Sequence, residues 1–435
     1  MRPRSKPATR MLAATRRALA EPPGRLSALF YAAALALWAS SWDMRLSVLM
    51  AWMPVEPIHV GTFAVLLCAV HRCGQPWRPS PWLVGVLVLL VVGFVPGALR
   101  SSAYGAGPAK LEAMVFVLLP VVCAAMILLD SREARRAWVA VQALLGAMVA
   151  LATVLTSHVS VLEPGRFTLA TVDTIATARP VGAAVVVMTL LALSARRRWW
   201  LLVPAALSAM VLVQVGSRGP LMFAMLSVLL VLLVGRSLSG RRLALTALAL
   251  VAGLGVYGYA VLDGGSGGVR LLSMIGSGLY DDSRLRLLET AWHLGQTHLL
   301  GVGWGDFAQA STVGAQAANS RGVSYAHNVF GEAFSEGGIP ALVVLCLAAL
   351  IALVRVQRLS SHRVDTVLLA TLIYWLLNAQ VSSDLVGNRF MWISIACGVA
   401  AGFAPASPAR AGAAADPSAD AEQSVGGERE PVMAV

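Results

Sequence analysis

Charged residues are scarce in this 435-residue chain: they make up 13% of it, whereas 57% is hydrophobic and the mean hydropathy is +0.72. Soluble domains are far less apolar and far more charged. The period-2 alternation of membrane β-barrels is also missing. The composition therefore excludes a soluble globular domain and predicts an all-α integral membrane protein.

Paired cysteines and clustered metal ligands are lacking too. The five cysteines show no CxxC spacing, which argues against a disulfide framework and against a zinc site. There is no DxD motif, Asp43 has no acidic neighbour, and Asp281-Asp282 adjoins arginine rather than a histidine or glutamate. We therefore expect no metal and no cofactor.

Long apolar runs are what the chain has in abundance. A membrane-crossing helix needs roughly 20 apolar residues, and such runs recur along nearly the whole sequence. They predict about twelve crossings, near residues 26–42, 46–70, 81–96, 109–129, 136–156, 174–194, 199–216, 219–235, 242–262, 327–354, 364–381 and 387–404.

Arginines mark one side of the membrane. With the basic arm 1–25 in the cytoplasm, the loops on that side are HRCGQPWRPS, DSREARR, ARRRWW, GRSLSGRR and RVQRLSSHR, as the positive-inside rule requires. The arm precedes Leu26–Trp42 without a cleavage site, so the first crossing is expected to stay. The Ala/Pro/Ser/Glu-rich tail 405–435 is expected to be disordered and cytoplasmic.

The one long interhelical loop, 263–326, then lies outside the cytoplasm, between the ninth and tenth crossings. In YDDSRLRLLETAWHLGQTHLL, four residues can share one face of an amphipathic helix: Leu285, Leu288, Trp292 and Leu294. The following GVGWG breaks that helix and is expected to form a turn.

Two polar helix starts face the same side as this loop. Arg218, in VGSRGPLM, is the only charge in a very short turn, where it either serves function or anchors the helix end by snorkelling. His327 and Asn328, in YAHNVFGEAFSEGG, open the tenth crossing, where the helix dipole disfavours a protonated imidazole. A neutral histidine there could accept a proton, although it could also be structural. Glu332 and Glu336 share a helical face that must look into protein or water.

These groups, together with Arg166 and either Arg284 or Arg286, predict a cationic pocket beside a base. Arginine forks suit phosphate oxygens. The chemistry alone therefore suggests a phosphorylated lipid as ligand.

The chain resembles the O-antigen ligase/polymerase family of membrane glycosyltransferases. The likeness covers the order of crossings, the single large loop, and three motifs: GSRGPLM, SRLRLLETAWHLGQTHLLGVGWGDF and AHNVFGEAFSEGGIPAL. It implies a glycan donor on undecaprenyl diphosphate, a lipid A core acceptor, and an inner-membrane enzyme with its active site facing the periplasm.

The resemblance also implies site residues. His327 would be the general base, with Arg218 and Arg284 as the other catalytic residues, while Arg166 and Arg179 would bind substrate. From their positions in the sequence, Arg286, Asn328 and Glu332 are further substrate-binding candidates. Arg179 departs from the family pattern, which more often has an asparagine-like residue there. A polymerase of the same family is the nearest alternative, and a transporter of lipid-linked glycans is a more distant one.

Because this scheme needs no metal, we predict that glycan transfer survives EDTA. Activity that disappears with EDTA and returns only with added Mg²⁺ or Mn²⁺ would contradict the metal-free scheme.

Overall fold

The computed structural model describes residues 24–41, 52, 54–74, 81–156, 158–159, 167–168, 174–194, 196–234, 282–321, 324–359, 363–381 and 383–401. The expected crossing at 242–262, the start of the long loop, most of the basic arm and the tail lie outside these ranges.

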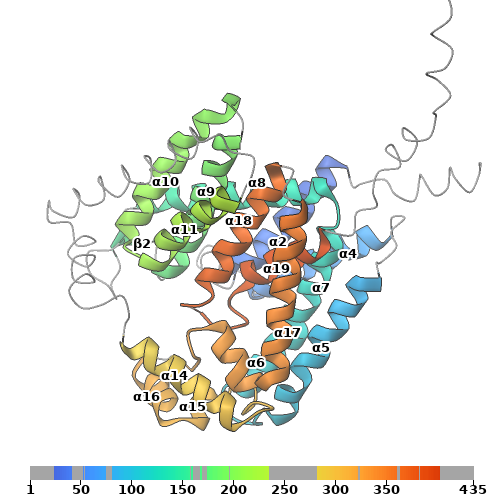
Figure 1. The fold of residues 1–435 in the computed structure, drawn as a ribbon, viewed down its shortest axis with the longest axis vertical. Helices are drawn as coiled ribbons and strands as arrows, with labels where there is room; N and C mark the ends of the chain where they lie inside the picture. The colour runs from blue at the N-terminus through green and yellow to red at the C-terminus, as the bar shows by residue number, and fades with distance from the viewer. Residues whose placement is uncertain are drawn as a thin grey trace, which may run out of the picture.

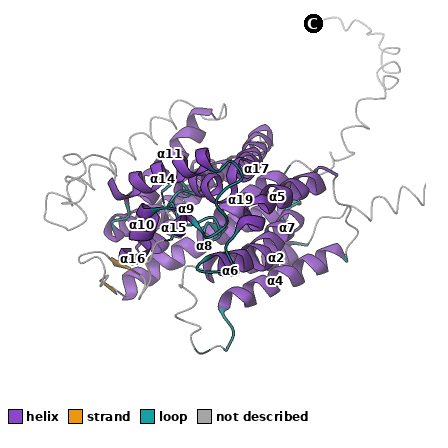
Figure 2. Ribbon diagram, turned by 90° about the horizontal axis from the view of Figure 1, so that it is seen from below, coloured by secondary structure: helices purple, strands orange, loops and turns teal. Residues whose placement is uncertain are grey.

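Helix accounts for most of the described chain, and the two-residue strands β1 (His158–Val159) and β2 (Phe167–Thr168) form one antiparallel pair (Figure 2). The helices of the first half are α2 (Arg25–Ser41), α4 (Pro57–Cys73), α5 (Pro81–Arg100), α6 (Gly107–Glu112), π-helical η1 (Ala113–Leu118), α7 (Leu119–Leu128), α8 (Arg132–Thr156), α9 (Thr174–Ser194), 3₁₀-helical η2 (Arg196–Leu201), α10 (Leu202–Val215) and α11 (Arg218–Val234). Those of the second half are α14 (Asp282–Thr297), α15 (Phe307–Ala310), α16 (Thr312–Arg321), α17 (Val329–Leu359), α18 (Arg363–Asn378) and α19 (Arg389–Ala400).

Five helical spans among the described residues are long and apolar enough to cross a membrane: Gly107–Leu128, Arg132–Thr156, Thr174–Ser194, Arg197–Val215 and Val329–Leu359. Six further apolar helices of 10–17 residues fall on other expected crossings. The described part of the chain is thus predominantly helical and has the character of a multi-pass membrane protein, while the number of twelve spans and the side on which the long loop lies stay predictions.

Two expected crossings differ from the helices found. The second was expected from residue 46, but α4 begins at Pro57, because a proline supplies no N–H and fits the first helical turn. The tenth was expected to be one continuous helix, but α17 is broken at Gly338, whose φ of 73° and ψ of −168° are not helical. A side chain is strained at such a φ, which glycine tolerates.

The continuous helix formed by α6, η1 and α7 is widened just before a proline. Pro120 has no N–H to donate to the carbonyl four residues earlier, and its ring would clash with that carbonyl. The π-helical η1 ends at Leu118, two residues before this proline. This irregular helix begins with the segment that carries Lys110.

The short helices of the long loop, α14, α15 and α16, gather at one end of the molecule beside the start of α17 (Figure 1). The buried face of α14 is formed by Leu287, Ala291 and Leu294. It differs from the expected face, because Leu285 and Trp292 are exposed by 38% and 49%. Helix α14 therefore packs against the rest of the protein with one face and exposes apolar side chains on the other face.

The GVGWG segment forms the expected turn, and this turn fills the break in α17. The N–H groups of Val302 and Gly303 donate to the carbonyls of Ser335 and Glu336 at 2.9 and 3.0 Å. On the far side of the break, the Ile339 N–H donates to the Leu299 carbonyl at 2.9 Å. The loop thus satisfies backbone groups that the broken helix would otherwise leave unpaired in the membrane.

Trp304 fastens this turn between α5 and α17. Its indole is fully buried, and Nε1 donates to the Phe94 carbonyl at 2.9 Å. The ring lies against two glycines: a Cβ on Gly97 would stand 2.6 Å from Nε1, and one on Gly337 would stand 2.5 Å from a ring carbon. The indole therefore fits because both neighbouring helices lack a side chain there.

We predict that Trp304→Ala destabilises the protein by about 3–5 kcal/mol, the usual cost of truncating a buried tryptophan. The measurement is thermal unfolding of the purified protein in detergent. Trp292→Ala is the control, because that ring is half exposed and should cost much less; equal losses for the two variants would contradict the role given to Trp304.

Candidate functional site

The turn between α18 and α19, described at residues 379–381 and 383–388, is where the candidate residues meet. The Val381 carbonyl accepts a hydrogen bond from Arg284 Nη1 at 3.0 Å. The Ala379 carbonyl accepts one from the Val329 N–H at 3.0 Å. The α18–α19 turn thus contacts both the first turn of α14 and the first residue of α17.

Asn328 joins the start of α17 to the same turn. Its Oδ1 accepts from the N–H groups of Phe330 and Gly331 at 3.0 and 2.9 Å, which caps the helix. Its Nδ2 donates to the carbonyl and to Oε1 of Gln380, both at 3.0 Å. Both polar atoms of its side chain are therefore engaged, and Asn328 holds the start of α17 against the α18–α19 turn. Its expected role in substrate binding stays a prediction.

His327 stands just before this cap. Its φ of 55° is uncommon for a residue with a side chain, and such backbone strain persists only where the surroundings hold it. The next two residues are fixed by their bonds to the α18–α19 turn. The imidazole is partly buried and meets the ring of Tyr325 edge to face, with 4.7 Å between centroids.

Arg218 is the first residue of α11, and the structure describes its backbone but not its side chain. Its neighbour Gly219 lies against the α18–α19 turn, since a Cβ there would stand 3.2 Å from Val381 Cγ2. The first turn of α11 thus adjoins the residue whose carbonyl binds Arg284.

Arg179 lies near the same place. It is buried within α9, and its carbonyl accepts from the Tyr374 hydroxyl at 2.7 Å. One turn later, a Cβ on Gly182 would be 3.2 Å from the Pro220 carbonyl of α11. Helix α9 therefore packs this arginine beside the start of α11.

The two loop arginines, Arg284 and Arg286, have different environments in the structure. Arg284 is partly buried and bonded to Val381, whereas Arg286 is exposed. Arg166 lies outside the described residues. Geometry therefore brings Arg284, Asn328, the His327 backbone and the start of α11 to one turn, and it does not bring Arg286 there.

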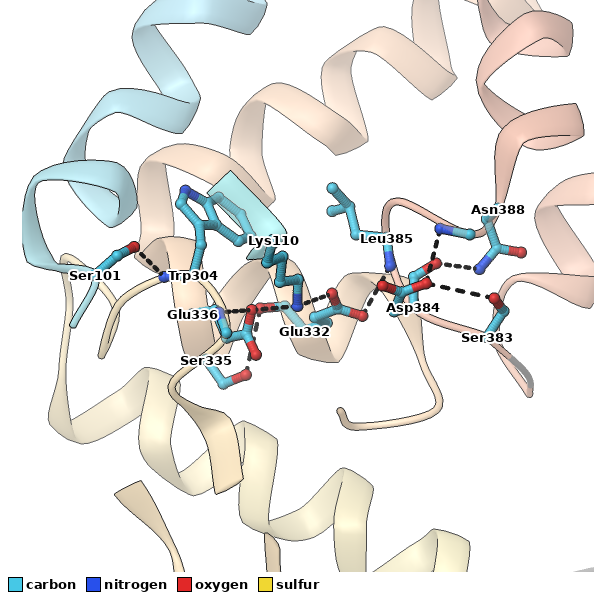
Figure 3. A network of polar contacts seen from close by, with 12 residues as sticks. Ser101, Lys110, Trp304, Glu332, Ser335, Glu336, Ser383, Asp384, Leu385 and Asn388 are labelled. Atoms are coloured by element: carbon cyan, nitrogen blue, oxygen red, sulfur yellow. Dashed lines mark hydrogen bonds and ion pairs between the residues drawn. The ribbon is translucent and has the colours of Figure 1, made fainter. Parts of the chain in front are cut away.

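A buried ion cluster lies one helical turn along α17 from Asn328, and it was not predicted from the sequence. The Lys110 ammonium lies 2.5 Å from Glu332 Oε1 and 2.5 Å from Glu336 Oε2 (Figure 3). Both glutamates are fully buried, and the lysine side chain is 10% exposed. The two glutamates were expected to face protein or water, and the structure shows that they face protein. The available signal was the lysine itself, because an ionisable residue at the start of an apolar run needs a partner.

Each carboxylate of the cluster also binds a backbone N–H. Glu332 Oε2 accepts from Leu385 in the α18–α19 turn, and Glu336 Oε2 accepts from Gly305 in the GVGWG turn, both at 2.9 Å. Within the α18–α19 turn, Asp384 Oδ1 accepts from the Gly387 N–H at 2.7 Å. Glu332 is thus bonded to Lys110 and to the α18–α19 turn, and its expected role in substrate binding stays a prediction.

This end of the molecule offers two kinds of chemical group, the arginine cation and the imidazole of His327. An arginine carries five N–H donors, so the bond to Val381 leaves donors of Arg284 for phosphate oxygens. Among the described residues, no three His, Cys, Asp or Glu side chains form a group that could hold a metal ion. All five cysteines are free.

Comparison with known proteins agrees with the resemblance. Residues 203–346 match the family model described as O-antigen ligase, a segment that runs from α10 into α17 and includes Arg218, Arg284 and His327. No curated protein matches the chain. Over residues 203–346, the chain is therefore similar to the O-antigen ligase family.

Proposed function

We propose that this protein is an O-antigen ligase, which moves a glycan from undecaprenyl diphosphate to a sugar hydroxyl of lipid A core at the periplasmic face of the inner membrane. The observation that carries the proposal is the meeting of Arg284, the start of α11 and the His327–Asn328 segment at the α18–α19 turn. The family match of residues 203–346 supports the same reaction class.

The arginines are assigned to the leaving group. As the glycosyl bond breaks, negative charge collects on the departing diphosphate, and preorganised donors stabilise it best in a partly dry site. Arg284 is oriented by its bond to Val381 before any ligand arrives. Arg218, at the start of α11, is the second donor. A single such donor typically contributes about 10²–10³-fold in rate.

His327 is assigned to the acceptor. As general base it takes the proton of the attacking hydroxyl, a contribution of typically ~10²–10⁴-fold. The hydroxyl oxygen attacks the anomeric carbon opposite the leaving diphosphate, so the configuration inverts. The held backbone of His327 favours this role, because a base must already stand in position when the acceptor binds.

The transporter alternative expects broken helices that form a polar site near the membrane midplane. Helix α17 is broken, but its break is filled by the GVGWG turn through backbone hydrogen bonds. Its broken backbone is therefore occupied by protein rather than open to a substrate.

We predict that Arg284→Ala lowers the rate of glycan transfer about 10²-fold or more, while Arg286→Ala lowers it much less. The reason is that only Arg284 is fixed to the α18–α19 turn. Membranes from cells that express each variant at matched levels provide the assay; equal losses, or a larger loss for Arg286→Ala, would overturn the assignment.

We predict that His327→Ala abolishes O-antigen on lipid A core. The measurement is a lipopolysaccharide gel from a deletion strain complemented with wild type or variant. Loss of all core-linked O-antigen, with long polymer kept on the polyprenyl carrier, is the ligase result. Single repeat units still attached to core would instead identify a polymerase, and full rescue by the variant would remove His327 from the mechanism.

A further inference from the structure

The charge balance of the Lys110–Glu332–Glu336 cluster is unusual for a purely stabilising contact. Burying charges costs free energy that ion pairing often only just recovers, so apolar replacements are frequently as stable. Here one ammonium serves two carboxylates, and all three groups lie in segments treated as membrane-spanning. Stability alone gives a weak reason for such a cluster.

The cluster is hydrogen-bonded to two other parts of the structure, the α18–α19 turn and the GVGWG turn. Glu332 reaches the α18–α19 turn through the Leu385 N–H, four residues from the Val381 carbonyl that binds Arg284. The same α17 helix carries the Asn328 cap one turn before Glu332. This carboxylate therefore fixes the distance between the α18–α19 turn and the helix start that follows His327.

Glu336 makes the second connection. Its Oε2 accepts from Gly305, and its carbonyl accepts from Gly303, both in the GVGWG turn. That turn follows α14, the helix whose first turn holds Arg284. Helix α14 is thus held at one end by the α18–α19 turn and at the other by the turn bound to Glu336.

Lys110, which lies on helix α6, contacts both of the carboxylates that make these bonds. It bridges the carboxylates of α17 from α6, so that its position sets the two side chains relative to each other (Figure 3). Charge-assisted bonds of this kind are shorter and more directional than neutral ones. In Figure 3, the dashed contacts run from Glu336 through Lys110 and Glu332 to the Leu385 N–H in the α18–α19 turn.

We propose that Lys110, Glu332 and Glu336 are positioning residues that set Arg284 relative to His327. The inference rests on the proposed function and deepens it, because it names residues that act on the reaction without touching substrate. A displacement of about 1 Å between reacting groups can cost about 10²-fold in rate, which is the effect that the cluster prevents.

The test separates positioning from stability by removing all three charges together. The variant Lys110→Met/Glu332→Gln/Glu336→Gln keeps side chains of similar size, and its amide oxygens can still accept from Leu385 and Gly305. Removing one partner alone would strand a buried charge, whereas removing the whole set avoids that penalty. The matched control is Arg72→Met/Asp130→Asn, which neutralises another largely buried ion pair, 3.0 Å long, between α4 and the turn that follows α7.

The measurements are melting temperature and the kcat and KM for glycan transfer, with purified full-length protein, undecaprenyl-diphosphate-linked glycan and lipid A core. We expect the triple variant to lose about tenfold or more in kcat, with KM and melting temperature near those of wild type and with the control unaffected in kcat. A triple variant as fast as wild type overturns the inference. If the triple variant does not fold, Lys110→Arg, which keeps the charge but displaces it, is measured in the same way.

A second measurement asks whether the cluster acts through Arg284. If it does, adding the triple substitution to Arg284→Lys lowers kcat little further, because neighbouring effects on one group do not add. Fully multiplicative losses would mean a general structural effect and would overturn the inference. Wild-type protein that transfers no glycan would refute the proposed function itself, and the positioning role with it; transfer by wild type and triple variant alike refutes the positioning role alone.

Discussion

The low polarity of the membrane interior is the constraint on which the rest of this structure depends. Unpaired charges and unpaired backbone groups are costly there. Helix α17 carries two buried carboxylates and a broken backbone, so it needs an ammonium and several N–H groups from elsewhere in the chain. Lys110 and the GVGWG turn supply them. The loop helices are consequently docked on the membrane bundle.

That docking decides what the loop can do. Helix α14 buries Leu287, Ala291 and Leu294 and is followed by a turn whose tryptophan is buried between glycines of α5 and α17. Arg284 extends from this fixed helix to the Val381 carbonyl. A flexible loop would present its arginine in many orientations, whereas Arg284 is bonded to the Val381 carbonyl, next to the start of α11. Preorganisation of this kind is what stabilisation of a leaving anion requires.

Sequence patterns predicted the helices well and their interruptions less well. Apolar runs placed α9 at residues 174–194, because hydrophobicity over about 20 residues is a strong signal. The break at Gly338 lies inside an equally apolar run, and hydropathy cannot register a backbone φ. The buried face of α14 was predicted one position away, because leucines occur on both sides of that helix. Leu287 is buried and Leu285 is exposed only because of where α17 lies.

The sequence by itself determined the class of protein, the apolar segments, and the polar residues at two helix starts, since these follow from local composition and from the cost of charge in a membrane. It also carried three motifs that resemble those of the O-antigen ligase family, whose model matches residues 203–346. Only the tertiary structure decided which residues meet. Lys110 and Glu336 are 226 positions apart, and so are joined by packing rather than by any local pattern. The choice of Arg284 over Arg286 for the α18–α19 turn came likewise from the rotation of α14, which is set by the face that it buries.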